Sequence, residues 1–295
     1  MGMPGETYES SKRGVDTLID GIEAVNLYVY VCTMLPNSAM SEPMYMRLNK
    51  IKSVRMPILL AHSTPEPQSS VEYQNVVVST KTMSREDWQR TYLFYWAVQA
   101  FHCLGLLKHV GVVFRKIFGV SYSDFYEQLI RHFETESTTA IGAEINLVKR
   151  IVAEAFDGGR LDLVLSEFGE ICWPLEEVSF LNLMKDKVGF YAEVRSFIGI
   201  LALKLGNPMD SALLDDLVLY QSSLMKDPET AEFSVAFQYD LHGYFEGTTK
   251  TLDRSSKRLL VRAGKGFEGD LEVYAREVVW YGRKGGQFHH LAVEI

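Results

Sequence analysis

The hydrophobic pattern of the first eighty residues predicts a helix followed by strands. Val15, Leu18, Ile19 and Ile22 follow the i, i+3, i+4, i+7 spacing of one apolar helix face. The run Leu27–Met34 is apolar on both faces, which is typical of a parallel strand buried between two layers. Extended segments are also expected at residues 54–60 and 76–78.

From Ser84 onward the pattern becomes helical. Ser84 and Asp87 form a capping box in which Asp replaces the usual Glu, and Ser121 with Asp124 repeats this arrangement after a stop at Gly119. Further helices are predicted around residues 145–152, from Pro174 along one apolar stripe to residue 198, and after Asp210.

The last sixty residues return to strand periodicity. Phe233–Tyr239 alternates apolar and polar side chains, which favours a strand. The remaining elements expected are a strand at 259–262, a helix from Asp270 that stops at Gly282, and a final strand at 287–294. These changes of period divide the chain into three predicted regions, residues 1–80, 81–227 and 228–295.

Two turns stand out in the first region. Gly2, Pro4 and Gly5 favour a tight turn, because Pro presets φ and Gly tolerates positive φ, and Thr7 follows as a helix N-cap. We therefore expect a turn between a strand and a helix, with the strand lying before Gly2. Leu35-Pro36 predicts a second turn after the apolar run.

Composition limits the classes of function. Hydrophobic residues make up 47% and charged residues 23% of the 295, so a packed core is expected. The net charge of −8 argues against a nucleic-acid partner, whose phosphates require a basic face. No secretory signal is recognisable, and three widely spaced cysteines favour reduced thiols in a cytoplasmic protein: Cys32, Cys103 and Cys172.

Four segments together resemble the cobalamin-binding branch of the radical S-adenosylmethionine (radical SAM) enzymes. Gly2–Thr7 (GMPGET) is similar to the turn after the fifth barrel strand, and Met34–Met40 (MLPNSAM) to the segment after the sixth. Val77–Trp88 and Ala275–Gly286 complete the resemblance in the same order. It implies a truncated TIM-type barrel end, then a mainly helical accessory region and a small α+β tail.

The resemblance implies the C-terminal portion of an enzyme that methylates or rearranges an unactivated carbon of an unknown small molecule. Its cofactors would be S-adenosylmethionine, a 4Fe-4S cluster and cobalamin, and its partners the missing N-terminal barrel half and cobalamin domain. The chain has no C-x3-C-x2-C spacing, so we expect it to bind none of these tightly alone and to be inactive alone. The alternative is a non-catalytic helical binding module derived from such an enzyme.

Carried over by position, the residues implied to line the S-adenosylmethionine pocket are Gly2, Pro4, Gly5, Glu6, Leu35 and Pro36. Glycine allows close approach of the backbone to a ligand, and a helix N-terminus offers free amides. From the residues alone, a simple turn followed by an N-cap is the favoured explanation of the first group.

Two other segments permit two interpretations each. Arg283–Gly286 is suited either to an anion site or, as we favour, to a helix end with cations near its negative pole. Tyr92–Leu107 has no formal charge and is too short to span a bilayer, so it is a core helix or, less favoured, an interfacial one. The histidines show no metal-binding spacing and are interpreted as structural.

Overall fold

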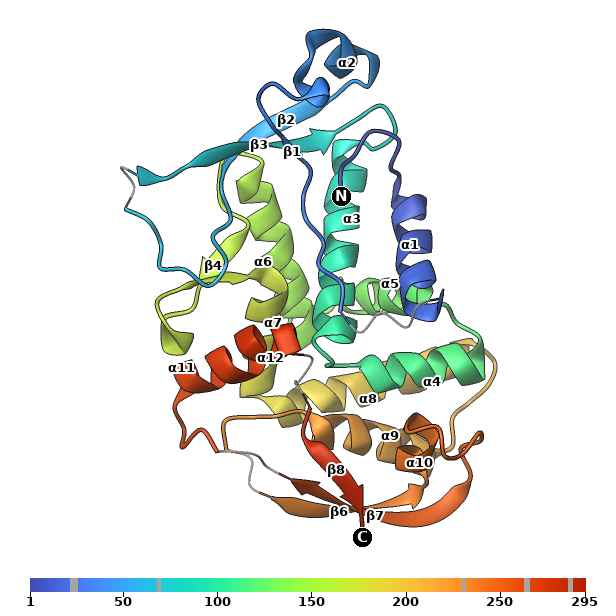
Figure 1. Ribbon diagram of the computed structural model, residues 1–295. Coiled ribbons are helices and arrows are strands. Elements are labelled where there is room, and N and C mark those ends of the chain that lie inside the picture. Colours follow the sequence, from blue (N-terminus) through green and yellow to red (C-terminus); the bar gives the residue numbers. More distant parts are fainter. Residues whose placement is uncertain (22–25, 68–69, 230–231, 263–265, 286–288) are drawn as a thin grey trace.

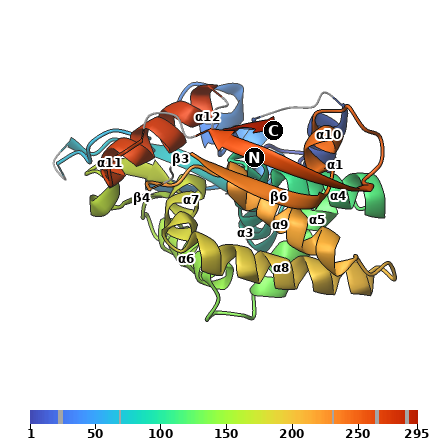
Figure 2. The same cartoon turned by 90° about the horizontal axis from the view of Figure 1, so that it is seen from below.

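A layer of helices lies between two small sheets in the computed structural model (Figure 1). The structure describes residues 1–21, 26–67, 70–229, 232–262, 266–285 and 289–295. Seen from below, the sheet containing β6 crosses the helical layer (Figure 2). Ile22, Gly286 and the start of the last predicted strand lie outside the described residues.

The N-terminal sheet has the order β1-β3-β2 and is antiparallel throughout. Of the predicted strand Leu27–Met34, only Thr33–Met34 (β1) pairs, and it runs antiparallel to β3 (Tyr73–Ser79). The prediction of a parallel strand is therefore wrong for the described residues. The expected burial is also wrong, since Tyr30 in this run is 76% exposed; apolar side chains on both faces fixed neither the burial of the segment nor the direction of its partner strand. β2 comprises Lys52–Pro57.

A closed barrel is absent from the described part of the chain, so membership of a truncated TIM barrel stays a prediction. The helices around the first sheet are α1 (Tyr8–Asp16), the π-helix η1 (Thr17–Gly21), the 3-10 helix η2 (Ala39–Ser41) and α2 (Pro43–Leu48).

The predicted caps of the helical layer are confirmed. The Ser84 hydroxyl accepts from the Asp87 amide, and the Asp87 carboxylate accepts from the Ser84 amide. Ser121 caps its helix through the amide of Asp124, but the second hydrogen bond of the predicted capping box is not formed there, and the Asp124 carboxylate pairs with Lys12 instead. The helices so placed are α3 (Arg85–Ala97), the π-helix η4 (Val98–Cys103), α4 (Lys108–Phe118), α5 (Tyr122–Phe133) and α6 (Ala140–Ala155).

The single long helix predicted after Pro174 is wrong. It is two helices, α7 (Leu175–Lys185) and α8 (Lys187–Lys204), interrupted at Asp186. The Asp186 carboxylate accepts from the amide of Gly189, so a new N-cap competes with continuation of the helix. Val188, placed on the apolar stripe, is 83% exposed. Asp210 caps α9 (Ser211–Leu224) as predicted.

The C-terminal sheet has the antiparallel order β6-β7-β8. Its first strand, β6 (Phe233–Tyr239), is confirmed, and β7 is longer than expected. The helix beginning at Asp270 does not stop at Gly282, which adopts helical angles and continues the helix. The remaining elements are β4 (Asp162–Val164), η5 (Ser166–Phe168), β5 (Cys172–Pro174), α10 (Leu241–Phe245), β7 (Arg254–Arg262), α11 (Leu271–Tyr274), the π-helix η6 (Ala275–Tyr281), α12 (Gly282–Gly285) and β8 (Leu291–Glu294).

The segment Tyr92–Leu107 forms the centre of the protein core. From Trp96 to Leu107 every residue is buried, as expected of a core helix. None of the described helices is by itself long and apolar enough to cross a bilayer. The helix pair Arg85–Cys103 and Lys108–Phe118, bent by 98°, is together long and apolar enough to cross a bilayer, on length and composition alone. One core cluster contains residues of all three predicted regions, whose boundaries stay predictions.

Candidate functional site

The opening turn has the geometry that its sequence predicts. Gly2 and Gly5 adopt φ of 93° and 92°, and the Glu6 amide donates to the Met3 carbonyl at 3.1 Å. With Pro4 and Gly5 at its two central positions, this is the arrangement of a type II turn. Thr7 caps α1 through the amide of Ser10.

Glu6 holds this turn together. One carboxylate oxygen accepts from the amides of Gly2 and Met3, at 2.6 and 3.0 Å, and the other from the Ser11 hydroxyl. The Thr82 hydroxyl accepts from the Gly5 amide and donates to the Glu6 carbonyl. The structural role of Glu6, which a local sequence pattern does not reveal, is therefore to fix the turn against the loop before α3.

Replacement of Gly2 by Ala is expected to destabilise the protein more than replacement of Gly5. Both residues occupy positive φ, which costs an L-residue about 1–2 kcal/mol. At Gly2 the new Cβ would also lie 3.0 Å from the Val77 carbonyl oxygen and 3.2 Å from Nε1 of Trp88, whereas the space at Gly5 is open. Urea denaturation of both variants tests this, and equal losses would contradict it.

The chain just before the second predicted turn contacts the opening segment. The Cys32 amide donates to the Met1 carbonyl at 2.8 Å, and the Cys32 thiol lies 3.3 Å from the sulfur of Met3. Leu35 and Pro36 follow directly after β1 and are exposed. None of the six residues proposed for the S-adenosylmethionine pocket lines either cavity described below, so their cofactor role stays a prediction.

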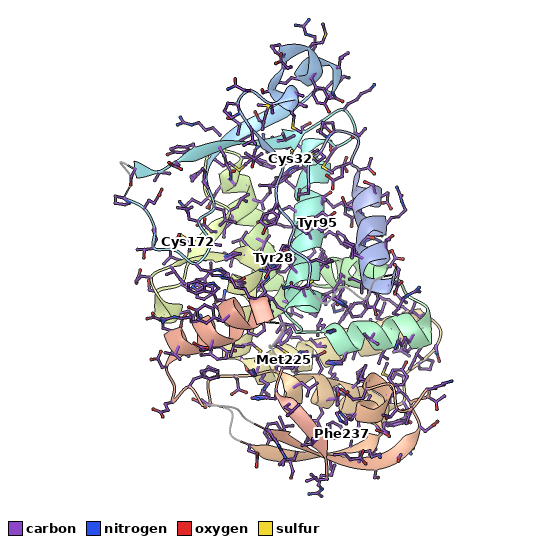
Figure 3. All side chains as sticks on the ribbon, in the orientation of Figure 1. Tyr28, Cys32, Tyr95, Cys172, Met225 and Phe237 are labelled. Atoms are coloured by element: carbon purple, nitrogen blue, oxygen red, sulfur yellow. The ribbon has the colours of Figure 1, made fainter. Side chains whose placement is uncertain are left out.

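A cavity of about 450 Å3, which we call the aromatic cavity, lies between residues 28–31, α3 and the start of α7. Aromatic rings cover much of its wall, and Figure 3 shows two of them, Tyr28 and Tyr95, near the centre of the molecule. Its volume falls within the range of small-molecule sites. The rings that line it are those of Tyr28, Tyr30, Tyr92, Tyr95 and Trp96.

One wall of the aromatic cavity is a buried ion-pair network. Arg283 Nη1 donates to Glu176 at 2.6 Å and to Glu177 at 2.8 Å, and Nη2 donates to Gln99 at 3.1 Å. The side chains of Arg283 and Glu177 are 3% and 1% exposed. Burial by itself would lower the pKa of Arg283, but the carboxylates of Glu176 and Glu177 outweigh it and raise this pKa.

His62 extends the network. Its Nε2 lies 2.6 Å from Glu177, and its ring stacks on Trp280 with the centroids 4.6 Å apart. The Gln99 side-chain oxygen that accepts from Arg283 also accepts from the Val29 amide. The network therefore joins residues 28–31, the π-helix η4, α7 and α12 around one wall of the aromatic cavity.

The sequence missed this network because its members are far apart along the chain. The local signal available was Glu176-Glu177, which begins two residues after Pro174, where acidic residues usually only complement a helix N-terminus. Arg283 does lie in the last turn of a helix, but its side chain is already bound by two carboxylates. These contacts favour the helix-end interpretation of Arg283, and the anion site, which includes Gly286 outside the described residues, stays a prediction.

The described residues do not fit a cluster held by three thiolates. The cysteines are unpaired and buried, and Cys32 and Cys172 lie well apart in Figure 3. Burial raises the pKa of all three thiols, whereas a metal ligand must be a thiolate. Within the described ranges no group of three His, Cys, Asp or Glu residues suits a metal ion.

Comparison with curated proteins finds two methyltransferases. The chain is 25% identical over 264 residues to TokK of Streptomyces tokunonensis, a cobalamin-dependent radical SAM methyltransferase, covering 84% of this chain and 38% of TokK. It is 23% identical over 303 aligned positions to a 2-(S-pantetheinyl)-carbapenam-3-carboxylate methyltransferase of Streptantibioticus cattleyicolor, covering 95% of this chain and 44% of that protein. No family model matches.

These matches define a class rather than an individual protein. The chain is distantly related to cobalamin-dependent radical SAM methyltransferases. It spans less than half the length of the curated relatives that it matches.

Proposed function

We propose that this chain is the C-terminal portion of a cobalamin-dependent radical SAM methyltransferase and is inactive alone. The observation that carries the proposal is the match over 84–95% of the chain to methyltransferases of which it covers only 38–44%. In such an enzyme the cluster and S-adenosylmethionine supply the radical chemistry, so the cysteines that this chain lacks must come from the remainder.

The distribution of exposed apolar side chains supports a docking partner for the first region. Among the described residues, ten of the twenty large hydrophobic side chains that are exposed lie before residue 75, in about a quarter of the chain. Tyr30 is 76% and Leu35 62% exposed. A concentration of exposed apolar side chains in one region of the chain favours an interaction site there. The proposed occupant is the N-terminal barrel half.

In this assembly the aromatic cavity faces the small-molecule substrate. Its apolar walls exclude water, and the polar wall at Glu176 and Arg283 orients one end of the molecule. The proposed contribution of the opening turn is one wall of the S-adenosylmethionine pocket, formed by Gly2, Pro4, Gly5 and Glu6, with Leu35 and Pro36 beside it. The related proteins favour methylation over rearrangement as the outcome.

The test is to express the gene together with the coding sequence directly upstream of Met1. The longer protein, reconstituted anaerobically with iron, sulfide and cobalamin, should show a 4Fe-4S EPR signal and form 5′-deoxyadenosine. The chain from Met1 alone should do neither. A stop codon and ribosome-binding site directly upstream, with no partner gene encoding the cluster motif, would instead favour the non-catalytic module. A stoichiometric cluster signal from the chain alone would contradict the cysteine argument.

A further inference from the structure

A second cavity, of about 520 Å3, lies between α1, α3, α5 and α6 and shares no lining residue with the aromatic cavity. Its floor is apolar: the side chains of Leu93, Ile130, Val148 and Val152 come from three helices, and each is less than 9% exposed. We call it the bundle cavity. An apolar floor of this size inside a helical layer is suited to an aliphatic group.

The rim of the bundle cavity carries an excess of positive charge. The charged residues that line it are three cations, Arg90, Arg131 and Lys149, and two carboxylates, Glu127 and Glu134. The pairing of these groups decides where the excess lies. Lys149 pairs with Glu134, which neutralises both.

Among the described residues, Glu127 is the one carboxylate that pairs with Arg90 and Arg131. Its Oε1 accepts from Nη2 of Arg90 and, at 2.8 Å, from Nη2 of Arg131, while its Oε2 accepts from Lys12 at 2.6 Å. Lys12 has its own counter-charge in Asp124, at 2.8 Å. One carboxylate therefore faces two guanidinium groups, and within the part of the chain that the structure describes one guanidinium charge at the rim is not neutralised.

The rim is also held in a fixed geometry. Burial would raise the pKa of Glu127, but its hydrogen bonds with Lys12, Arg90 and Arg131 outweigh burial and lower the pKa to about 2. Glu127 is therefore ionised at neutral pH and holds both arginines. The guanidinium carbon of Arg90 lies 3.8 Å from the ring centroid of Tyr8, which orients the group. Arg131 is more exposed, at 59%, and has further N–H donors to offer.

We propose that the bundle cavity binds an amphipathic monoanion, a carboxylate carried on an aliphatic chain. The aliphatic part covers the apolar floor, and the carboxylate accepts hydrogen bonds from Arg131 at the rim. A cationic ligand is opposed by the surplus positive charge, and a dianion exceeds the single charge available. This inference is independent of the proposed methyltransferase role.

The experiment is isothermal titration of the full chain with decanoate, in parallel with decanol and decyltrimethylammonium. Decanoate is expected to bind saturably at one site and more tightly than decanol, with an affinity that falls as salt is added. The cationic amphiphile is expected to bind most weakly. Absence of decanoate binding, or equal binding of decanoate and decanol, would overturn the proposal.

Two variants locate the site. Arg131→Gln removes the surplus charge while Glu127 keeps Lys12 and Arg90, so the fold is retained and decanoate affinity should fall by roughly tenfold. Val152→Phe fills the floor and should abolish binding. Arg150→Gln is the matched control, since Arg150 is exposed on the same helix as Val152 and does not line the cavity. Wild-type affinity in a folded Arg131→Gln protein would place the ligand elsewhere and sink the idea.

Discussion

Replacing Arg283 by methionine is expected to lower the free energy of unfolding by about 3–5 kcal/mol. The substitution keeps most of the apolar stem but leaves the carboxylates of Glu176 and Glu177 without their shared cation. Glu177 is 1% exposed, so water cannot replace the guanidinium. Removing one partner of a buried pair is costly because the remaining charge stays desolvated.

Chemical denaturation followed by circular dichroism measures this loss. Arg150→Met, an exposed arginine on α6, is the matched control and should change stability by less than about 0.5 kcal/mol. Adding Glu177→Gln to Arg283→Met should recover part of the loss, because the buried uncompensated charge is then removed. If Arg283→Met unfolds at the wild-type denaturant concentration, the ion-pair network does not hold the C-terminal helix to α7.

Acidification from about pH 6.5 to pH 4 is expected to unfold the protein progressively. Burial lowers the pKa of His102 to about 3 and those of His289 and His290 to about 4. Burial also holds the pKa of His109 well below its ordinary value, with help from His289. Each imidazole stays neutral in the folded protein while its unfolded counterpart takes up a proton below about pH 6.5.

The direction of this pH dependence follows from the difference in bound protons between the unfolded and folded states. Between pH 4 and 6.5 the unfolded state binds more protons at these four sites, so stability rises with pH and is lost as the pH falls. Each such histidine contributes a slope of about 1.4 kcal/mol per pH unit where it is charged only in the unfolded state. Burial raises the pKa values of Glu144 and Asp216, which acts in the opposite sense, but these groups are fewer.

Urea unfolding at several pH values between 4.5 and 6.5 tests this expectation. His290→Leu removes one buried titrating group and should flatten the slope by about 1.4 kcal/mol per pH unit. It should therefore gain stability relative to the wild type as the pH falls. A free energy of unfolding that does not vary with pH in this window would mean that these imidazoles are not neutral in the folded protein.

The sequence by itself determined the features that depend on neighbouring residues. The Ser84–Asp87 capping box, the Asp210 cap and the Gly2–Glu6 turn are all present, because each is fixed by backbone angles and hydrogen bonds within a few residues. The alternation of side chains also predicted β6 correctly, because this period-2 pattern is read from neighbouring residues even though the strand pairs with the distant β7. The family relation also came from the sequence, since it rests on four segments in order and not on contacts.

Only the tertiary structure decided which distant groups meet. An apolar run on both faces predicted an interior strand at Leu27–Met34, but Tyr28 and Tyr30 are exposed, and pairing with β3 set the antiparallel direction of the last two residues. The break at Asp186 depended on competition between a new cap and a continuing apolar stripe. Arg283 looked like a helix-end cation because its two carboxylates lie more than a hundred residues away. Buried charges find their partners through the packing of helices, and no local pattern records that pairing.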